Sequence, residues 1–266
     1  MALDLEKIRQ KVAELNGELK KNRFSDWRWA PPESGECLIR ALPWKDSDGQ
    51  PIKERNFYYN IGIKGGALSP TQFQKPDPVR EFIKKLYKDD TDASKELAKK
   101  LYPSMRGYIP VIVRGEEDKG VRIWPFSPKI YKRLYAMLID ADIGDFTDPL
   151  EGRDLKVNVV KNPKNKYPDI TVDPTMKQSP LSKDKQQIKT WLENIPELDD
   201  KLPQLMSYDA LQKALDDWLN GADKMKSEGS EPIRERLATS DVSSDELAST
   251  TMGELDDAFA DLESEE

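Results

Sequence analysis

The chain has 266 residues, of which 34% are charged and 37% are hydrophobic, and its formal net charge is −7. The absence of histidine excludes imidazole-based catalytic dyads and triads. The single cysteine, Cys37, excludes an internal disulfide and a zinc site built from cysteine and histidine. There is no apolar run near the roughly 18 residues of a membrane span and no signal-peptide pattern, so we expect a soluble protein without membrane contact.

Charge is distributed unevenly along the chain. Residues 227–266 hold 13 acidic and two basic residues, whereas residues 1–226 have a net charge of +4. This asymmetry indicates a body that binds polyanions and a tail that imitates one. A solubilising tail on an ordinary domain is the alternative. The tail has few large apolar residues, and we expect it to be disordered.

The first expected element is an amphipathic helix within residues 1–24. Its apolar residues recur at spacings of three and four, at Leu5, Ile8, Val12, Leu15 and Leu19. We expect this helix to pack on the body or to mediate self-association. Residues 25–226 would then form the core domain, with an inserted helical subdomain at about 64–106, and residues 227–266 the protein-interaction tail.

Short strands and a few helices are expected within the core domain. Aromatic and β-branched runs predict strands at residues 36–42, 56–63, 108–114, 121–126 and 155–160. Helical periodicity predicts helices at residues 77–87, 92–102, 128–139, 185–194 and 207–219. Five short strands with a helix between the fourth and fifth predict an α+β fold built on a small mixed barrel. Trp191 and Trp218 lie on amphipathic helices and are predicted core residues.

Basic and aromatic residues alternate in several strands and loops. Cations neutralise phosphates, and aromatic rings stack on unpaired bases with about 1–3 kcal/mol each, so this mixture suits single-stranded nucleic acid. It does not require base edges to be read, and we expect little sequence specificity. The candidate nucleic-acid-binding residues are Arg40, Tyr58, Lys99, Lys100, Arg106, Tyr108, Arg122, Trp124, Lys129, Lys164, Lys166 and Tyr167.

Structural roles compete with these assignments. Apolar residues surround Arg40, so a buried ion pair and a phosphate contact are equally compatible with the sequence. Packing is also an open alternative for Tyr108 and Trp124. Tyr167 lies in a basic loop without apolar neighbours, which favours a binding role.

An enzymatic function has little support in the sequence. Asp140, Asp142 and Asp145 could hold a divalent ion for a nuclease, but they follow a predicted helix and lead into Thr147-Asp148-Pro149. A solvated turn explains them better. Neither a P-loop nor a dinucleotide-binding fingerprint occurs. We therefore expect a protein that is not an enzyme and needs no cofactor or metal.

The order of these segments resembles the family of single-stranded DNA-binding, helix-destabilising proteins of T-even-type bacteriophages. The resemblance covers most of the body, from Trp27 to the closing helices, and no single motif is diagnostic. It rests on IRALP around Arg40, YNIG at residues 59–62, GYIPVIV, VRIWPFSPKIY at residues 121–131, LKVNVVKNPKNKYPD, and the acidic tail.

The resemblance implies an OB-fold-like five-stranded barrel with a helical insertion and flanking helices. It also implies a groove for single-stranded DNA that includes Arg40, Lys99, Lys100, Arg106, Tyr108, Trp124 and Tyr167. Such a protein would coat and protect single-stranded DNA in phage replication, recombination and repair, in the cytoplasm of the infected bacterial host, with possible self-association along the DNA. Its tail would recruit phage replication and recombination proteins through Leu255, Asp256, Asp257, Phe259 and Leu262.

The sequence departs from the family's pattern in three places. The positions that best match the family's zinc ligands read Ile61, Asp77 and Arg80, with the fourth near Ala67, so no zinc site can form there. We therefore expect the insertion to be held by packing of Val79, Phe82, Ile83 and Leu86 against Leu97 and Leu101. The family's N-terminal cooperativity motif is only faintly matched by residues 20–25, and Pro125 replaces a basic residue.

A second hypothesis comes from a different class of protein. The acidic tail would suit an interaction module or DNA mimic that occupies the nucleic-acid site of a host protein. Truncation after Lys226 distinguishes the two hypotheses. A DNA-binding protein would bind DNA more tightly once its competing tail is removed, whereas a mimic would lose its function.

Overall fold

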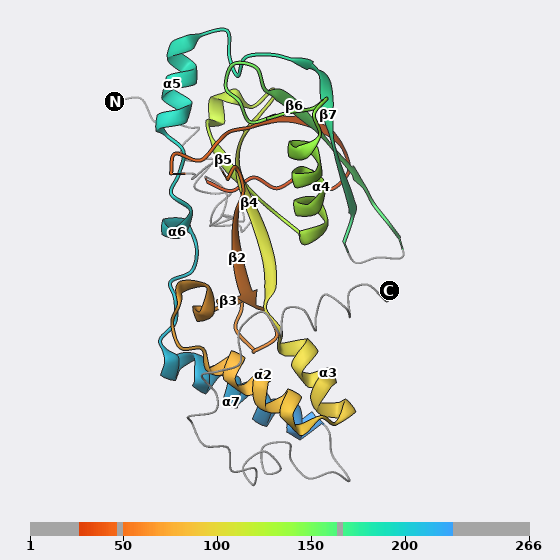
Figure 1. The fold of residues 1–266 in the computed structure, drawn as a ribbon, viewed down its shortest axis with the longest axis vertical. Coiled ribbons are helices and arrows are strands. Elements are labelled where there is room, and N and C mark those ends of the chain that lie inside the picture. The colour runs from red at the N-terminus through yellow and green to blue at the C-terminus, as the bar shows by residue number, and fades with distance from the viewer. Residues whose placement is uncertain (1–26, 47–49, 164–166, 226–266) are drawn as a thin grey trace, which may run out of the picture. The chain divides into compact units, whose positions relative to one another are not determined.

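The computed structural model describes residues 27–46, 50–163 and 167–225 (Figure 1). The chain forms two compact units. Of the described residues, the larger comprises those up to Tyr59 together with those of 65–75 and 103–206; the smaller comprises residues 60–64, 76–102 and 207–225. The predicted N-terminal helix, the acidic tail with its five candidate contact residues, and Lys164 and Lys166 lie outside the described residues.

An antiparallel sheet forms the frame of the larger unit. Its strands are β1 (Gly35–Ala41), β2 (Lys53–Tyr58), β3 (Ala67–Leu68), β4 (Ser104–Val113), β5 (Arg122–Phe126), β6 (Arg153–Val160) and β7 (Asp169–Gln178). They are ordered β3-β2-β4-β1-β6-β7, and β5 also pairs with β4. β4 is the central strand: residues 104–108 pair with β2, residues 111–113 with β1, and residues 107–111 with β5.

This sheet is open rather than closed. Within the described part of the chain, no strand pair connects β7 back to β3 or β5. The α+β class is therefore confirmed, whereas the closed five-stranded barrel is not.

The five predicted strands correspond to β1, β2, β4, β5 and β6, and the sequence analysis missed β3 and β7. β7 contains Pro174. The structure tolerates Pro174 because β7 is an edge strand and because its pairing with β6 shifts register between Arg153 and Leu155, next to this proline.

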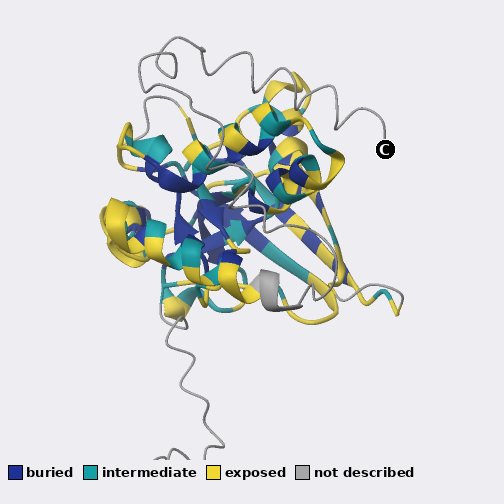
Figure 2. Ribbon diagram, turned by 90° about the horizontal axis from the view of Figure 1, so that it is seen from below, coloured by how far each residue is buried: buried dark blue, intermediate teal, exposed yellow. Residues whose placement is uncertain are grey.

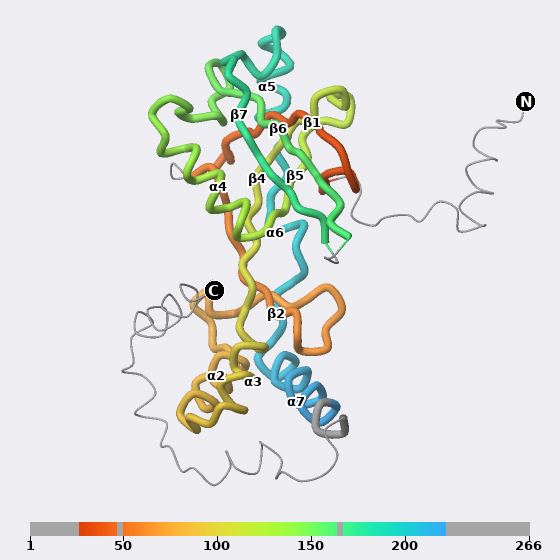
Figure 3. Tube along the Cα trace, turned by 90° about the vertical axis from the view of Figure 1, so that its right-hand side faces the viewer, coloured from red at the N-terminus to blue at the C-terminus, as the bar shows by residue number. Residues whose placement is uncertain are grey.

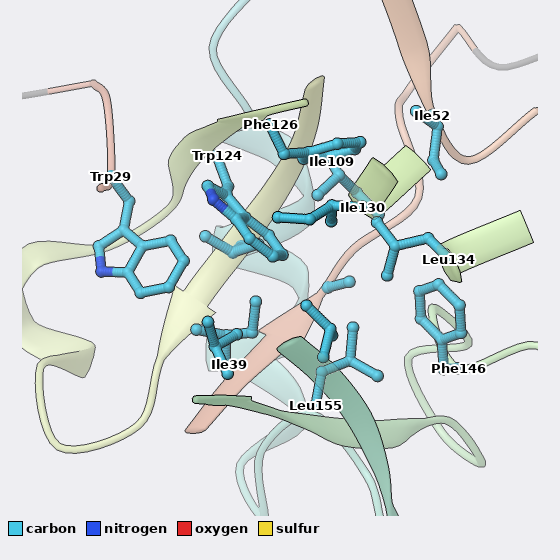
Figure 4. Close-up of a cluster of buried hydrophobic side chains, with 14 of the residues drawn as sticks. Trp29, Ile39, Ile52, Ile109, Trp124, Phe126, Ile130, Leu134, Phe146 and Leu155 are labelled. Carbon is cyan, nitrogen blue, oxygen red and sulfur yellow. The ribbon is translucent and has the colours of Figure 1, made fainter. Parts of the chain in front are cut away.

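One face of the sheet carries the first hydrophobic cluster, which α4 (Pro128–Ile139) covers through Ile130, Leu134 and Met137. Trp124 lies inside this cluster, edge-on to Trp29 at a centroid distance of 5.3 Å and to Phe126 at 5.1 Å (Figure 4). The cluster also explains Gly107. A Cβ atom at that position would lie 2.2 Å from the Phe126 ring, so only glycine lets the ring pack there.

A second cluster lies on the other face of β4, because Tyr108 and Ile112 alternate with residues of the first cluster. It is covered by α5 (Lys185–Glu193) and by the short α6 (Leu198–Lys201). Trp191 of α5 is 7% exposed, which confirms its predicted core role. The chain that follows α5, residues 194–206, contains α6 and is called the α6 linker below.

The smaller unit consists of α2 (Pro78–Asp89), α3 (Asp92–Leu101) and α7 (Tyr208–Met225). The side chain of Asp77 caps α2 by accepting hydrogen bonds from the backbone of Val79 and Arg80, at 3.1 and 3.2 Å. Thr91 caps α3 in the same way. The helices turn buried residues inward and exposed residues outward (Figure 2).

Apolar packing holds the smaller unit together. Its buried residues include Val79, Ile83, Leu86, Leu101, Leu211, Leu215 and Leu219. The predicted contact between the two inserted helices is thus confirmed, with Phe82 and Leu97 half-buried at its edge. The predicted core domain includes α7, whereas α7 belongs to the same compact unit as the inserted helices. None of the helices in the described residues is long and apolar enough to cross a bilayer.

Candidate nucleic-acid interface

Five of the predicted contact residues are buried. Their exposed fractions are 0% for Arg40, 1% for Tyr58, 5% for Tyr108, 7% for Arg122 and 1% for Trp124. The expectation that Trp124 stacks on a base is corrected, because both faces of its indole ring are covered by core side chains. The expectation that Tyr58 and Arg122 contact nucleic acid is corrected for the same reason, because both are buried. The Tyr58 hydroxyl contacts Ser69, and Arg122 pairs with Glu116 at 2.6 Å.

Two roles for Arg40, a buried ion pair and a phosphate contact, were compatible with the sequence. In the structure Arg40 forms the buried ion pair. Its guanidinium contacts Asp154 at 3.3 Å and donates to the carbonyl oxygens of Asp148 and Ser179. Arg114 holds the same Asp154 carboxylate with two hydrogen bonds, at 3.0 and 2.8 Å. Burial lowers the pKa of Arg40, and the nearby Asp154 charge opposes that shift. Arg40 therefore connects β1 to β6 and the neighbouring loops, and its side chain is not exposed to solvent.

The other predicted residues with described side chains are more accessible, but they lie in different places. Lys99 and Lys100 are exposed on α3 of the smaller unit, and Lys129 is exposed at the start of α4 in the larger one. Tyr167, in the β6–β7 loop, is 72% exposed. Arg106 is half-buried on β4, where it belongs to the surface described next.

Basic and aromatic side chains gather on one face of β2 and β4. Lys53 pairs with Tyr108 and Arg55 with Arg106 in the register of the two strands, so these four side chains share a face. Tyr59 follows β2 and stacks on Phe57, with ring centroids 5.7 Å apart and planes 22° apart. We call this surface, formed by Lys53, Arg55, Tyr59, Arg106 and Tyr108, the β2–β4 strip.

The exposed end of the strip is formed by Tyr59 and Arg106. The Arg106 guanidinium lies over the Tyr59 ring, 5.6 Å from its centroid, and its Nε donates to the Tyr59 hydroxyl at 3.3 Å. Gly66 packs against this ring so closely that a Cβ atom there would approach it to 2.8 Å. Tyr59 nevertheless remains 38% exposed. A flat ring and a cation are thus presented to solvent together.

Positive charge surrounds the inner end of the strip. Burial is the main reason why the pKa of Tyr108 is raised, and the nearby Tyr59 adds to it, while Arg28, Arg106 and Arg55 act in the opposite direction. Three guanidinium groups therefore lie near enough to the Tyr108 phenol to act on it electrostatically.

Carboxylates partly neutralise the strip. Asp46 bonds Lys53 at 2.7 Å, and that ammonium also lies 4.5 Å from the centroid of the Trp44 ring. Asp199 of α6 bonds Arg55 through both of its oxygens. The hydrogen bond from Lys53 is the main reason why the pKa of Asp46 is lowered.

The predicted contact residues include Arg106 and Tyr108 but not Arg28, Lys53, Arg55 or Tyr59. A usable signal existed, because Lys53, Arg55, Phe57 and Tyr59 alternate with the period of a strand. The second predicted strand began at residue 56, which left Lys53 and Arg55 outside it. β2 in fact begins at Lys53.

A separate groove lies between α4 and β7. Its volume is about 270 Å³, and it is lined by Lys129, Ile130, Arg133 and residues 170–173. Arg133 is held across it by Asp173 at 2.7 Å and by the carbonyl oxygen of Val172 at 3.2 Å. This groove carries Lys129 of the predicted set but no aromatic ring.

The aspartates at residues 140–145 stabilise turns, as the sequence analysis favoured. Asp140 accepts a hydrogen bond from the backbone of Asp142 at 2.9 Å, and Asp145 accepts from the backbone and hydroxyl of Thr147 at 2.8 and 2.6 Å. Within the described part of the chain, no three acidic or cysteine side chains are grouped as metal ligands.

Comparison with the models of known protein families and with curated proteins finds no match to this chain.

Proposed function

We propose that this chain is a non-enzymatic protein that binds single-stranded DNA with little sequence preference, and that the β2–β4 strip is its contact surface. One observation carries the proposal: the Arg106 guanidinium lies over the ring of Tyr59, and that ring is 38% exposed. Arginine side chains recognise phosphates through paired N–H donors. A tyrosine ring with an accessible face stacks on unpaired bases of any sequence.

The wider role rests on the sequence resemblance. We propose that the protein coats and protects single strands in phage replication, recombination and repair, in the cytoplasm of the infected bacterial host. Binding only the open strand would shift hairpins toward opening by mass action. The acidic tail would recruit replication and recombination proteins. We also propose that β1, β2, β4, β5 and β6 correspond to the strands of an OB-fold-like barrel, an assignment that rests on the same resemblance.

The test is a titration of the full chain with oligo-dT, followed by tryptophan fluorescence. Tyr59→Ala should weaken binding by about 5- to 150-fold, which corresponds to roughly 1–3 kcal/mol of stacking. Arg106→Ala should weaken binding and reduce its salt dependence. About four phosphate contacts predict a slope of about −3 in a plot of log affinity against log salt concentration.

Arg133→Ala provides the matched control, because it also removes one arginine but from the α4–β7 groove. It should bind oligo-dT like the unmodified chain. If Arg133→Ala weakens binding and Arg106→Ala does not, the groove replaces the strip as the contact surface. An affinity that does not change with salt would refute a phosphate-binding surface altogether.

A further inference from the structure

We propose that Asp199 is an internal substitute for a DNA phosphate, which holds Arg55 in the absence of DNA and must be displaced when DNA binds. This inference rests on the proposed function and concerns the regulation of the same site. The carboxylate belongs to the α6 linker, which runs beside β2 and β4 (Figures 1 and 3). The occupant that displaces it would be one backbone phosphate of a single strand.

Arg55 contacts Asp199 through two parallel hydrogen bonds, which is also how arginine binds a phosphate. Nε of Arg55 donates to Oδ1 of Asp199 at 2.9 Å, and Nη2 donates to Oδ2 at 2.8 Å. A phosphate would use the same pair of donors. The remaining terminal nitrogen, Nη1, donates to the backbone carbonyl oxygen of Glu54 at 2.7 Å. Arg55 therefore cannot make a two-pronged contact with a phosphate while Asp199 is in place.

The positions of the two side chains show which one would move. The Arg55 side chain is 19% exposed, whereas that of Asp199 is 60% exposed, so the carboxylate lies on the solvent side of the cation. Leu198, the neighbour of Asp199, is 1% exposed and packs in the second hydrophobic cluster. Leu202 and Leu205 pack against the same cluster. A rotation of the Asp199 side chain alone would free Arg55, and the α6 linker could stay anchored.

Lys53 is covered in the same manner, whereas Arg106 is not. Asp46 bonds Lys53, and the two side chains are 58% and 18% exposed, respectively. Among the described residues, no carboxylate pairs with Arg106, whose polar partner is the Tyr59 hydroxyl. We infer that a strand first binds at Arg106 and Tyr59, and that its next phosphate then competes with Asp199 for Arg55.

The experiment compares Asp199→Asn with Asp200→Asn in oligo-dT titrations of the full chain. Both changes remove one negative charge from α6, but Asp200 forms no ion pair within the described part of the chain. An exposed ion pair contributes up to about 1 kcal/mol, so Asp199→Asn should raise the affinity about two- to fivefold. Asp200→Asn should change it much less. In an Arg55→Ala background, Asp199→Asn should have no further effect.

The outcomes separate this inference from the function on which it rests. If the unmodified chain does not bind oligo-dT, the proposed function fails. If it binds, and Asp199→Asn matches Asp200→Asn, only the internal competition is refuted. Weaker binding by Asp199→Asn would also overturn it, since Asp199 would then hold Arg55 in its productive position. If Asp199→Asn raised the affinity for oligo-dT equally in the unmodified chain and in the Arg55→Ala background, competition at Arg55 would be refuted.

Discussion

Arg55 and Arg106 lie directly opposite each other on β2 and β4. Two like charges at such positions destabilise a strand pair by roughly 0.2–1 kcal/mol. The two side chains diverge: Arg55 bonds Asp199 of the α6 linker, and Arg106 lies over the Tyr59 ring. The strip therefore combines one neutralised arginine with one that is available to an anion. This contrast underlies the order of contacts inferred above.

Replacing Trp124 should affect folding rather than DNA contact. Its ring is 1% exposed and packs edge-on to Trp29 and Phe126. Trp124→Ala should lower the free energy of unfolding by about 3–5 kcal/mol, because a large core side chain is lost and a cavity remains. Urea unfolding would measure this change. Trp124→Phe should cost less and should preserve oligo-dT binding by the folded protein.

Tyr167→Ala is the control for that experiment, because Tyr167 is 72% exposed. It should change the free energy of unfolding by less than about 0.5 kcal/mol. A Trp124→Phe protein with unchanged stability but lost DNA binding would contradict the core assignment and restore a stacking role for Trp124.

The ion pairs and hydrogen bonds of Arg40 predict that Asp154→Asn destabilises the fold more than Arg40→Met does. Asp154→Asn leaves the fully buried guanidinium of Arg40 without its counter-charge, and should destabilise the fold by about 3–5 kcal/mol. Arg40→Met should cost less, about 1–3 kcal/mol, because it leaves two carbonyl oxygens without donors while Arg114 still neutralises Asp154. Chemical unfolding of both variants would measure the order, and the reverse order would contradict this account.

The hydrogen bond between Tyr208 and Glu81 predicts a dependence on pH. The Tyr208 hydroxyl donates to Glu81 at 2.7 Å, and this contact raises its pKa from 10.0 to about 12. The protonated phenol is therefore favoured in the folded state. The resulting stabilisation is complete below pH 10 and is lost as the pH rises through about 12.

Tyrosinate absorbance of the unmodified chain minus that of Tyr208→Phe would isolate this titration. The midpoint should lie near pH 12, and it should fall toward 10 in Glu81→Gln. A midpoint already at 10 in the unmodified chain would show that the hydrogen bond does not form in solution.

Local sequence patterns predicted most of the elements. Helical periodicity and proline at the first turn predicted α4 at residues 128–139, which are its observed bounds. Aromatic and β-branched runs predicted the strands that are buried on at least one face. β7 was not among the predicted strands; most of its residues are exposed or half-buried, so it lacks the apolar run that marked the other strands.

The candidate site was harder to predict than the elements. Arg106 and Tyr108 were selected because they sit beside other basic and aromatic residues in the sequence. Arg40 and Trp124 satisfied the same criterion, yet both are buried. The type of a residue determines whether its side chain can stack on a base or pair with a charge. It does not determine whether the side chain is exposed to solvent. Asp199 could not be assigned to Arg55 at all, since 144 positions separate them.

The mixed α+β class, the helical insertion, the lack of imidazole chemistry and the uneven charge could all be predicted, because each follows from residue identity and from short-range periodicity. The tertiary structure alone decided that the sheet is open, which basic and aromatic residues are covered, and which carboxylates neutralise the strip. Burial and ion pairing depend on contacts between segments far apart in the chain, and no local pattern encodes those contacts.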